Sequence, residues 1–134
     1  MPRVMLPLSR TRAAVAGLAA GLATVALAGC ATTSATYNSP LLALKVTEFQ
    51  ITPESVKMAP GPIRIRLTND GVLVHEVAIA NADGKILGQT GAVFPGHTAV
   101  SRAFTVTPGT YRVYDPGANY ADLGAYGSLS VRSG

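Results

Sequence analysis

The sequence predicts an all-β fold, a Greek-key β-sandwich of about seven or eight strands preceded by a signal-peptide helix. Apolar and polar residues alternate over short segments, which is typical of strands with one buried face. Turn-forming residues separate these segments, and beyond the N-terminal segment no window carries a helical period over three turns. The 134 residues suit a single domain, and the 48% hydrophobic content excludes a disordered chain.

Residues 1–29 are predicted to be a lipoprotein signal peptide. Residues 1–12 are basic, and the apolar run over residues 13–28 is shorter than the ~20 residues that span a bilayer. The run ends in Leu27-Ala28-Gly29-Cys30, which resembles the bacterial lipobox, where the cysteine takes a lipid. The alternative is a plain anchor helix with an incidental cysteine. Cys30 is the only cysteine, so we expect the mature domain to have neither a disulfide nor a thiolate ligand.

Residues 30–40 are predicted to form the lipidated cysteine and a flexible tether, and residues 41–134 the folded domain. Lipid anchoring predicts a position in the cell envelope, outside the cytoplasm, on the periplasmic or cell-surface side, with the membrane as a partner. The net charge of +4 arises largely in the signal, where three arginines precede residue 13. The domain carries no clustered basic patch, so nucleic acid is not a predicted partner.

The strands of the domain are predicted in chain order from two-residue alternation and from turn dipeptides. Asp83-Gly84 and Pro108-Gly109 mark two of the turns. The inward-facing residues of the strands are Leu44 and Val46, with Phe49 and Ile51 extending this opening segment, then Ile63, Ile65 and Leu67, then His75, Val77 and Ile79, then Phe104 and Val106, then Tyr111 and Val113, and finally Leu129 and Val131.

Four motifs follow one another along this domain. They are Asn69-x-Gly71-x-x-x-His75-x-x-x-Ile79, Phe94-Pro95-Gly96-His97-Thr98, Pro108-Gly109-Thr110-Tyr111-x-Val113 and Gly124-x-x-Gly127-x-Leu129-x-Val131. In this order and spacing they resemble the cupredoxins, the blue-copper proteins, over most of residues 44–131. The resemblance implies a cupredoxin-like Greek-key sandwich.

The same resemblance implies that most ligands of a type 1 copper site are missing. Such a site needs two imidazoles, one thiolate and usually a weak axial thioether. In one common loop length of the family, the Cys, second His and Met positions fall on Asp115, Tyr120 and Ala125, so that only His75 is retained. This pattern argues against blue-copper electron transfer, and no cofactor is expected.

A metal site of another kind is conceivable at the same end of the sandwich. His75 and Asp115 are each in phase with inward-facing residues, and the resemblance places His97 near them. Two imidazoles and a carboxylate suit Cu(II) or Zn(II), and Tyr114 or Tyr120 could add a phenolic oxygen. The alternative is that His75 packs inside, His97 is solvated and Asp115 forms a turn.

These features of the sequence lead to two hypotheses for the function of the protein. The favoured hypothesis is a non-catalytic, membrane-anchored binding module in which Tyr114, Tyr120 and Tyr126 contact an envelope protein or a small ligand, unless these rings only fill space. The alternative is a copper-handling protein of the cell envelope that binds Cu(II) at His75, His97 and Asp115. No Ser-His-acid order and no paired carboxylates stand out, so we do not expect an enzyme.

Overall fold

The computed structural model describes residues 32–134, so the predicted signal peptide and Cys30 lie outside the described residues. The described part is an all-β sandwich of eleven strands in two sheets, and it contains no helix. The predicted fold class is confirmed. The strand number exceeds the prediction because several short strands have no alternating apolar pattern. Within the same range, no helix is long and apolar enough to cross a membrane.

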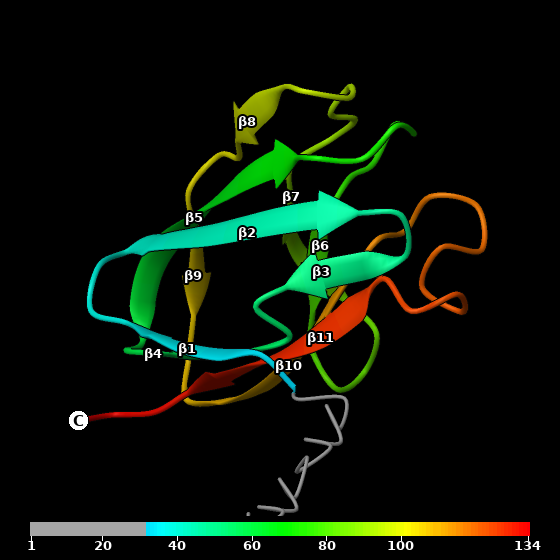
Figure 1. The fold of residues 1–134 in the computed structure, drawn as a ribbon. Coiled ribbons are helices and arrows are strands. Elements are labelled where there is room, and N and C mark those ends of the chain that lie inside the picture. Colours follow the sequence, from blue (N-terminus) through cyan, green and yellow to red (C-terminus); the bar gives the residue numbers. More distant parts are fainter. Residues whose placement is uncertain (1–31) are drawn as a thin grey trace, which may run out of the picture.

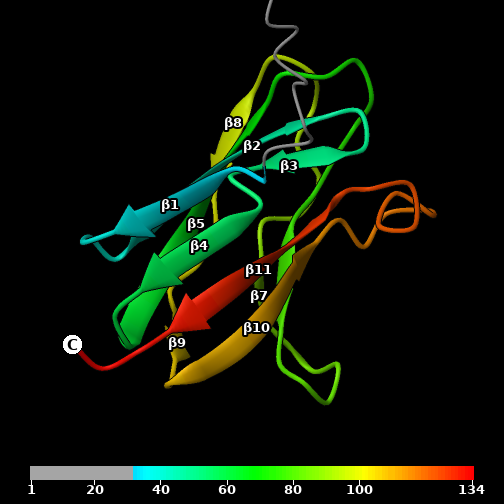
Figure 2. The same cartoon turned by 60° about the horizontal axis from the view of Figure 1, so that its bottom comes forward.

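The first sheet has six strands, and Figure 2 shows four of them, β1, β4, β11 and β10, lying side by side. Its order is β1 (Ser34–Tyr37), β4 (Ser55–Met58), β11 (Tyr126–Val131), β10 (Gly109–Tyr114), β6 (Ala78–Ala80) and β7 (Ile86–Gln89). The second sheet packs against it (Figure 1) in the order β3 (Gln50–Thr52), β2 (Leu41–Thr47), β5 (Gly61–Asn69) and β8 (Thr98–Val100), and β9 (Phe104–Val106) also pairs with β5.

Alternation along β5 builds the inner face of the second sheet. Ile63, Ile65 and Leu67 are buried, whereas Arg64 and Arg66 between them are exposed. The predicted inward-facing residues of β10 and β11 are buried in the same way. Apolar area removed from water between the sheets drives this packing. The buried apolar residues run from position 42 to position 131, so the described residues contain the core that holds the two sheets together.

The segment that contains His75 differs from its prediction. His75, Val77 and Ile79 are buried as expected, but β6 begins only at Ala78, and His75 instead forms an isolated bridge with Val93. Ala78 and Ala80 are buried too, although alternation with the inward-facing Val77 and Ile79 predicts them on the solvent-exposed face. These alanines are small, and they pair with Tyr114 and Arg112 of β10, whose long side chains flank them.

The tether predicted over residues 31–40 is wrong for Ser34–Tyr37, which form β1. This strand pairs in parallel with β4, and the Tyr37 hydroxyl donates a hydrogen bond to the Ala43 carbonyl at 2.6 Å. The pairing uses backbone N–H and C=O groups, so it needs no apolar alternation and left no pattern in the sequence. The connection between Cys30 and the sandwich is therefore shorter than predicted.

The turns predicted at Asp83-Gly84 and Pro108-Gly109 are present, and a third lies at Pro95-Gly96. In the Pro95-Gly96 turn, Gly96 has φ 77°, and the His97 N–H donates to the Phe94 carbonyl at 3.1 Å. After the turn between β9 and β10, the Tyr111 hydroxyl donates to the Thr107 carbonyl at 2.6 Å. The same hydroxyl accepts the Thr107 N–H at 3.0 Å, so this tyrosine fixes the corner between the two strands.

Candidate functional site

One end of the sandwich, which we call the loop end, is formed by the segments that follow β5 and β10 and by the segment that precedes β8 (Figure 1). Backbone bonds join two of these segments. The Asn69 N–H donates to the His97 carbonyl at 2.9 Å, and the Gly96 N–H donates to the Asn69 carbonyl at 2.8 Å. The residues that the sequence singled out as a candidate site lie at or beside this end.

Asn69 organises the loop end from a buried position. Its amide donates to the carbonyls of Leu73 and Val93, both at 2.8 Å, and its side-chain oxygen accepts the Gly71 N–H at 2.9 Å. These bonds hold the loop after β5 against the segment before β8 and leave few buried polar atoms without a partner. A Cβ on Gly71 would overlap the carboxylate of Glu48, so a larger residue at this position would displace that side chain.

His75 and Asp115 form a buried pair at the centre of the loop end. The two side chains are fully buried, and His75 Nδ1 lies 2.7 Å from Asp115 Oδ2. A carboxylate oxygen only accepts, so Nδ1 carries the proton and donates it. The other carboxylate oxygen accepts the Gly117 N–H at 2.8 Å. Burial of these polar groups is tolerated because they are bonded to each other and to the backbone.

Glu48 approaches the opposite nitrogen of the imidazole. Its Oε1 lies 3.5 Å from His75 Nε2, a buried atom without a hydrogen-bond partner. The same oxygen accepts the N–H groups of Val72 at 2.5 Å and Leu73 at 2.9 Å. The hydrogen bond from Leu73, with smaller contributions from Val72 and His75, lowers the pKa of Glu48 against an opposing desolvation. Glu48 was not among the predicted site residues, although it is in phase with the inward-facing Val46.

Tyr120 covers the imidazole from the loop after β10. The ring centroids of Tyr120 and His75 lie 5.0 Å apart, and Tyr120 also contacts the ring of Phe49 at 5.6 Å. Ala125 is fully buried, and its N–H donates to the Tyr120 carbonyl at 3.0 Å. Of the residues at the predicted Cys, His and Met positions, Asp115 and Tyr120 contact His75 as an acceptor and an aromatic cover, and Ala125 is bonded to both of them through its backbone.

His97 does not join His75 and Asp115 in a metal-binding group. It lies at the same end of the sandwich, but it is exposed, and its Nδ1–H donates to the Pro95 carbonyl at 3.0 Å. Among residues 32–134, no group of three or more His, Cys, Asp or Glu side chains is placed to hold a metal ion. The structure therefore brings together two of the three predicted ligands.

Comparison with solved structures identifies the fold. Auracyanin from Roseiflexus castenholzii superimposes with a TM-score of 0.65 at 17% identity, covering 72% of this chain and 100% of that one. Auracyanin B gives 0.61 at 16% identity, over 75% of this chain and 91% of that one. Auracyanin A from Chloroflexus aurantiacus, a "blue" copper protein, gives 0.58 at 14%, over 69% and 99%.

The fold is cupredoxin-like. At these identities the likeness to auracyanins shows the fold alone. No protein-family model matches the chain, and no curated protein matches it.

The three tyrosines predicted as one contact surface are divided in this cupredoxin-like sandwich. Tyr120 packs inward against His75, whereas Tyr114 and Tyr126 are directly paired across β10 and β11. Tyr114 is half-buried beneath the guanidinium of Arg112, which lies 4.5 Å from the ring centroid. Only Tyr126 is well exposed, at 57%. Tyr114 and Tyr126 lie on neighbouring strands, whereas the loop after β10 turns Tyr120 toward His75.

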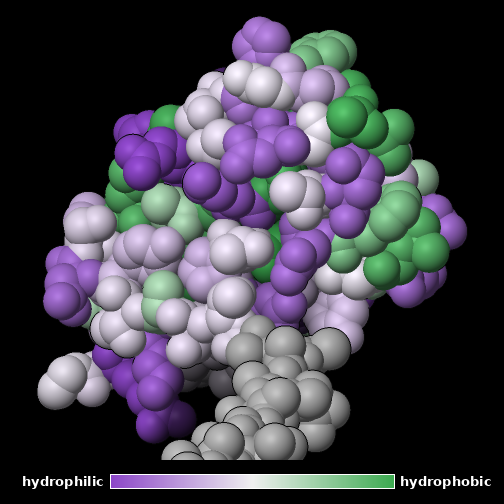
Figure 3. Space-filling view, viewed as in Figure 1, coloured by the Kyte–Doolittle hydropathy of each residue, from purple (hydrophilic) through white to green (hydrophobic). Residues whose placement is uncertain are grey.

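A different exposed surface lies at the loop end. It consists of Val72, Leu73, Val74 and Phe94, and we call it the tip surface. Val72 is 80% and Phe94 62% exposed. Figure 3 shows apolar side chains gathered over the side of the molecule where the loops after β5 and β10 lie. The hydrogen bonds of Asn69 to the backbone at Leu73 and beside Phe94 connect the two parts of this surface.

Proposed function

We propose that this protein is a non-catalytic, lipid-anchored, extracytoplasmic cupredoxin-like module that binds another protein through its tip surface and carries no type 1 copper. The observation that carries the proposal is the 2.7 Å contact between buried His75 and Asp115 beneath that surface. The resemblance assigns His75 as a copper ligand, but its imidazole is hydrogen-bonded to the carboxylate of Asp115, which stands at the position of the thiolate ligand.

The donor set does not fit a type 1 centre. That centre depends on a thiolate sulfur, and the single cysteine of the chain, Cys30, precedes the described domain. Asp115 stands at the thiolate position, with both oxygens engaged by His75 and Gly117. Ala125, at the axial position, offers no donor atom in its side chain. We therefore derive no electron-transfer step for this chain.

The tip surface has the properties of a protein-binding surface. Contiguous exposed apolar residues on a small domain are costly unless a partner covers them. The backbone beneath Val72 and Leu73 is fixed by Glu48 and Asn69, so little conformational entropy is lost when a partner binds. These features favour a partner with a complementary apolar patch over a small polar ligand.

Membrane attachment is the second part of the proposal. The order of a basic start, a short apolar run and Leu27-Ala28-Gly29-Cys30 supports cleavage and lipidation at Cys30. Two or more acyl chains hold a protein stably, whereas one gives only marginal binding. We expect the mass of membrane-extracted protein to match a diacylated or triacylated Cys30 product, and we expect Cys30→Ala to abolish that mass. An unmodified cysteine in the membrane fraction would contradict this part.

Site-specific photocrosslinking tests the binding surface. A photoreactive phenylalanine analogue at Val72 or Phe94 is expected to give a discrete adduct with one envelope protein, whereas the same group at exposed Ala82 gives none. The identified partner is then purified, and Val72→Asp should weaken its binding to the full chain at least tenfold, which is about 1.4 kcal/mol. Equal adduct yields at the three positions, or unchanged affinity of the Val72→Asp variant, would show that the tip surface does not bind the partner.

Copper handling through a non-thiolate site is the second candidate. One observation favours it: the buried Nε2 of His75 has no hydrogen-bond partner and faces the carboxylate of Glu48 at 3.5 Å. Loading with Cu(II), followed by metal analysis and electron spin resonance, separates the candidates. The proposed function predicts no bound equivalent above background. One equivalent that is lost in His75→Ala would establish copper binding instead.

A further inference from the structure

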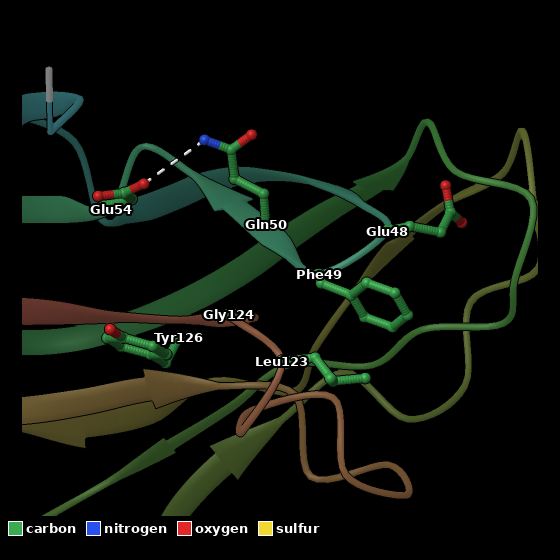
Figure 4. A pocket seen from close by; sticks show the side chains of 7 residues that line it. All are labelled: Glu48, Phe49, Gln50, Glu54, Leu123, Gly124 and Tyr126. Carbon is green, nitrogen blue, oxygen red and sulfur yellow. Dashed lines mark hydrogen bonds between the residues drawn. The ribbon is translucent and has the colours of Figure 1, made fainter. Parts of the chain in front are cut away.

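A groove of about 500 Å³ lies between the start of β3 and the segment that leads into β11. We call it the Tyr126 groove. Figure 4 shows the ring of Phe49 directed toward the side chain of Leu123 and the carboxylate of Glu48 directed away, toward the loop after β5. The groove is lined by Phe49, Gln50, Glu54, Leu123, Gly124 and Tyr126, together with Glu48. Glu48 and Phe49 connect it to His75 and Tyr120, whereas no residue of the tip surface lines it.

The described chain begins beside this groove. The Thr33 carbonyl accepts the N–H groups of Glu54 at 3.1 Å and Ser55 at 3.0 Å, and the Thr33 hydroxyl also accepts the Glu54 N–H at 3.0 Å. Thr33 is thus fixed to the residue that forms one wall of the groove. The next residue begins β1, which holds this end of the chain to the edge of β4.

The covalent chain leaves little distance between this point and the membrane. Only two residues separate Thr33 from Cys30, and three residues span at most about 11 Å even when fully extended. This step rests on the proposed lipidation of Cys30. When Cys30 is held at the bilayer surface, Thr33 and its neighbour Glu54 must lie at the headgroup level or directly above it.

The side chains at the mouth of the groove suit that position. Tyr126 is 57% and Leu123 49% exposed. Tyrosine favours the interface between lipid and water because its ring is apolar and its tip is polar. No Lys or Arg lines the groove, and Glu54 bonds only to Gln50 through its side chain, at 3.4 Å. Attraction to anionic lipids therefore plays no part in contact at this surface.

We infer that the Tyr126 groove is the membrane-facing surface of the anchored domain, and that Tyr126 and Leu123 contact the lipid headgroup region. This orientation keeps the loop after β5, which carries Val72 of the tip surface, on the edge of the molecule away from the start of the described chain (Figure 1). The anchor thus sets which surface meets the membrane and which remains available to a partner protein.

The absence of tryptophan from the chain permits a direct test with single-tryptophan reporters. Tyr126→Trp reports on the groove, Val72→Trp on the tip surface, and Ala82→Trp on the turn between β6 and β7 at the opposite end of the sandwich. Each full-length variant is expressed, processed in its host, extracted and reconstituted into vesicles of brominated phosphatidylcholine. We expect strong loss of fluorescence for Tyr126→Trp, and fluorescence equal to that in unbrominated vesicles for Ala82→Trp and Val72→Trp.

Each outcome decides the inference. Equal quenching at all three positions, quenching greatest at Val72→Trp or Ala82→Trp, or no quenching anywhere would overturn it. Addition of phosphatidylglycerol should leave the pattern unchanged, and a requirement for this anionic lipid would contradict the contact mechanism. If Tyr126→Trp loses the thermal transition of the wild type, Leu123→Trp reports on the same groove.

A second arrangement separates this inference from the proposed lipidation. A chain starting at Cys30 contains the whole core, so it can be coupled through its only thiol to a maleimide lipid in the same vesicles. Quenching of Tyr126→Trp in the coupled protein, together with an unmodified Cys30 in the cellular product, would support the geometry and reject the natural anchor. Lipidation without quenching at the groove would reject the geometry alone.

Discussion

The middle of the sandwich and its loop end are stabilised in different ways. Between the sheets, Ile65, Leu67 and Leu129 are fully buried and contribute only apolar area. At the loop end, His75 and Asp115 are buried just as deeply, but each of them depends on a specific hydrogen-bond acceptor or donor. A buried position in the middle therefore requires only an apolar side chain of suitable size. A buried position at the loop end also requires a donor or acceptor atom at a particular place.

The largest expected effect is in the middle. Ile65→Ala removes buried methyl groups and leaves a cavity between the sheets, and it should lower the free energy of unfolding by about 2–5 kcal/mol. Urea denaturation measures the change. Arg66→Ala, on the exposed side of the same strand, should change it by less than about 0.5 kcal/mol. Equal losses for the two variants would show that the sheets do not enclose the core as described.

Removal of one polar partner at the loop end should have the next largest effect. Asp115→Ala deprives His75 Nδ1–H and the Gly117 N–H of their acceptor, which should cost about 1.5–3 kcal/mol in unfolding free energy. Asp115→Asn keeps one acceptor oxygen and should recover part of the loss. Exposed Asp122→Ala serves as the control in the same urea titration. An Asp115→Ala variant as stable as that control would break the comparison.

A smaller effect is expected at the corner between β9 and β10. Tyr111→Phe keeps the buried ring but removes a hydroxyl that donates to the Thr107 carbonyl and accepts the Thr107 N–H. The loss should be about 0.5–1.5 kcal/mol, measured by thermal denaturation. Tyr126→Phe, at an exposed position, is the matched control and should leave the midpoint unchanged. A difference in midpoint between the two variants would show that specific polar contacts contribute to stability outside the loop end as well.

The smallest effect is a dependence on pH. The folded protein lowers the pKa of Glu48 below its usual 4.5, chiefly through the Leu73 N–H, so ionised Glu48 stabilises the fold at higher pH. That contribution is lost as the pH falls through this range. Glu48→Gln should therefore be less stable than the wild type at neutral pH, and the two should converge in acid. Glu54→Gln, which loses no backbone hydrogen bond, is the control. Parallel urea midpoints for wild type and Glu48→Gln at every pH would contradict this assignment.

Strands with one buried and one solvent-exposed face could be predicted from the sequence. Ile63 and Leu67 with their arginine neighbours indicated β5, and Tyr111 with Val113 indicated β10. β1 and β7 could not be predicted, because pairing through the backbone at a sheet edge requires no particular side chains. The burial of Ala78 depended on the large neighbours that the partner strand supplies.

The candidate site was predictable in part. Phase along the strands placed His75 and Asp115 inside, and the structure adds that they touch. Glu48 continues the inward phase of Val46, but its approach to His75, like that of Tyr120, depends on turns that bring distant segments together, which strand periodicity does not encode. His97 shows the same limit: its segment is at the predicted end, but the direction of its ring depends on the Pro95 carbonyl.

The parallel pairing of β1 with β4 also bears on self-association. Four residues, from Ser34 to Tyr37, cover the edge of β4 and form the short outer strand of the sheet in its place, with Tyr37 packed against the core. Because only three residues separate this strand from Cys30, proteolysis that cuts the chain beyond Tyr37 would also uncover the edge of β4. Under the proposed anchoring at Cys30, release from the membrane and a tendency to aggregate would then be consequences of a single cut.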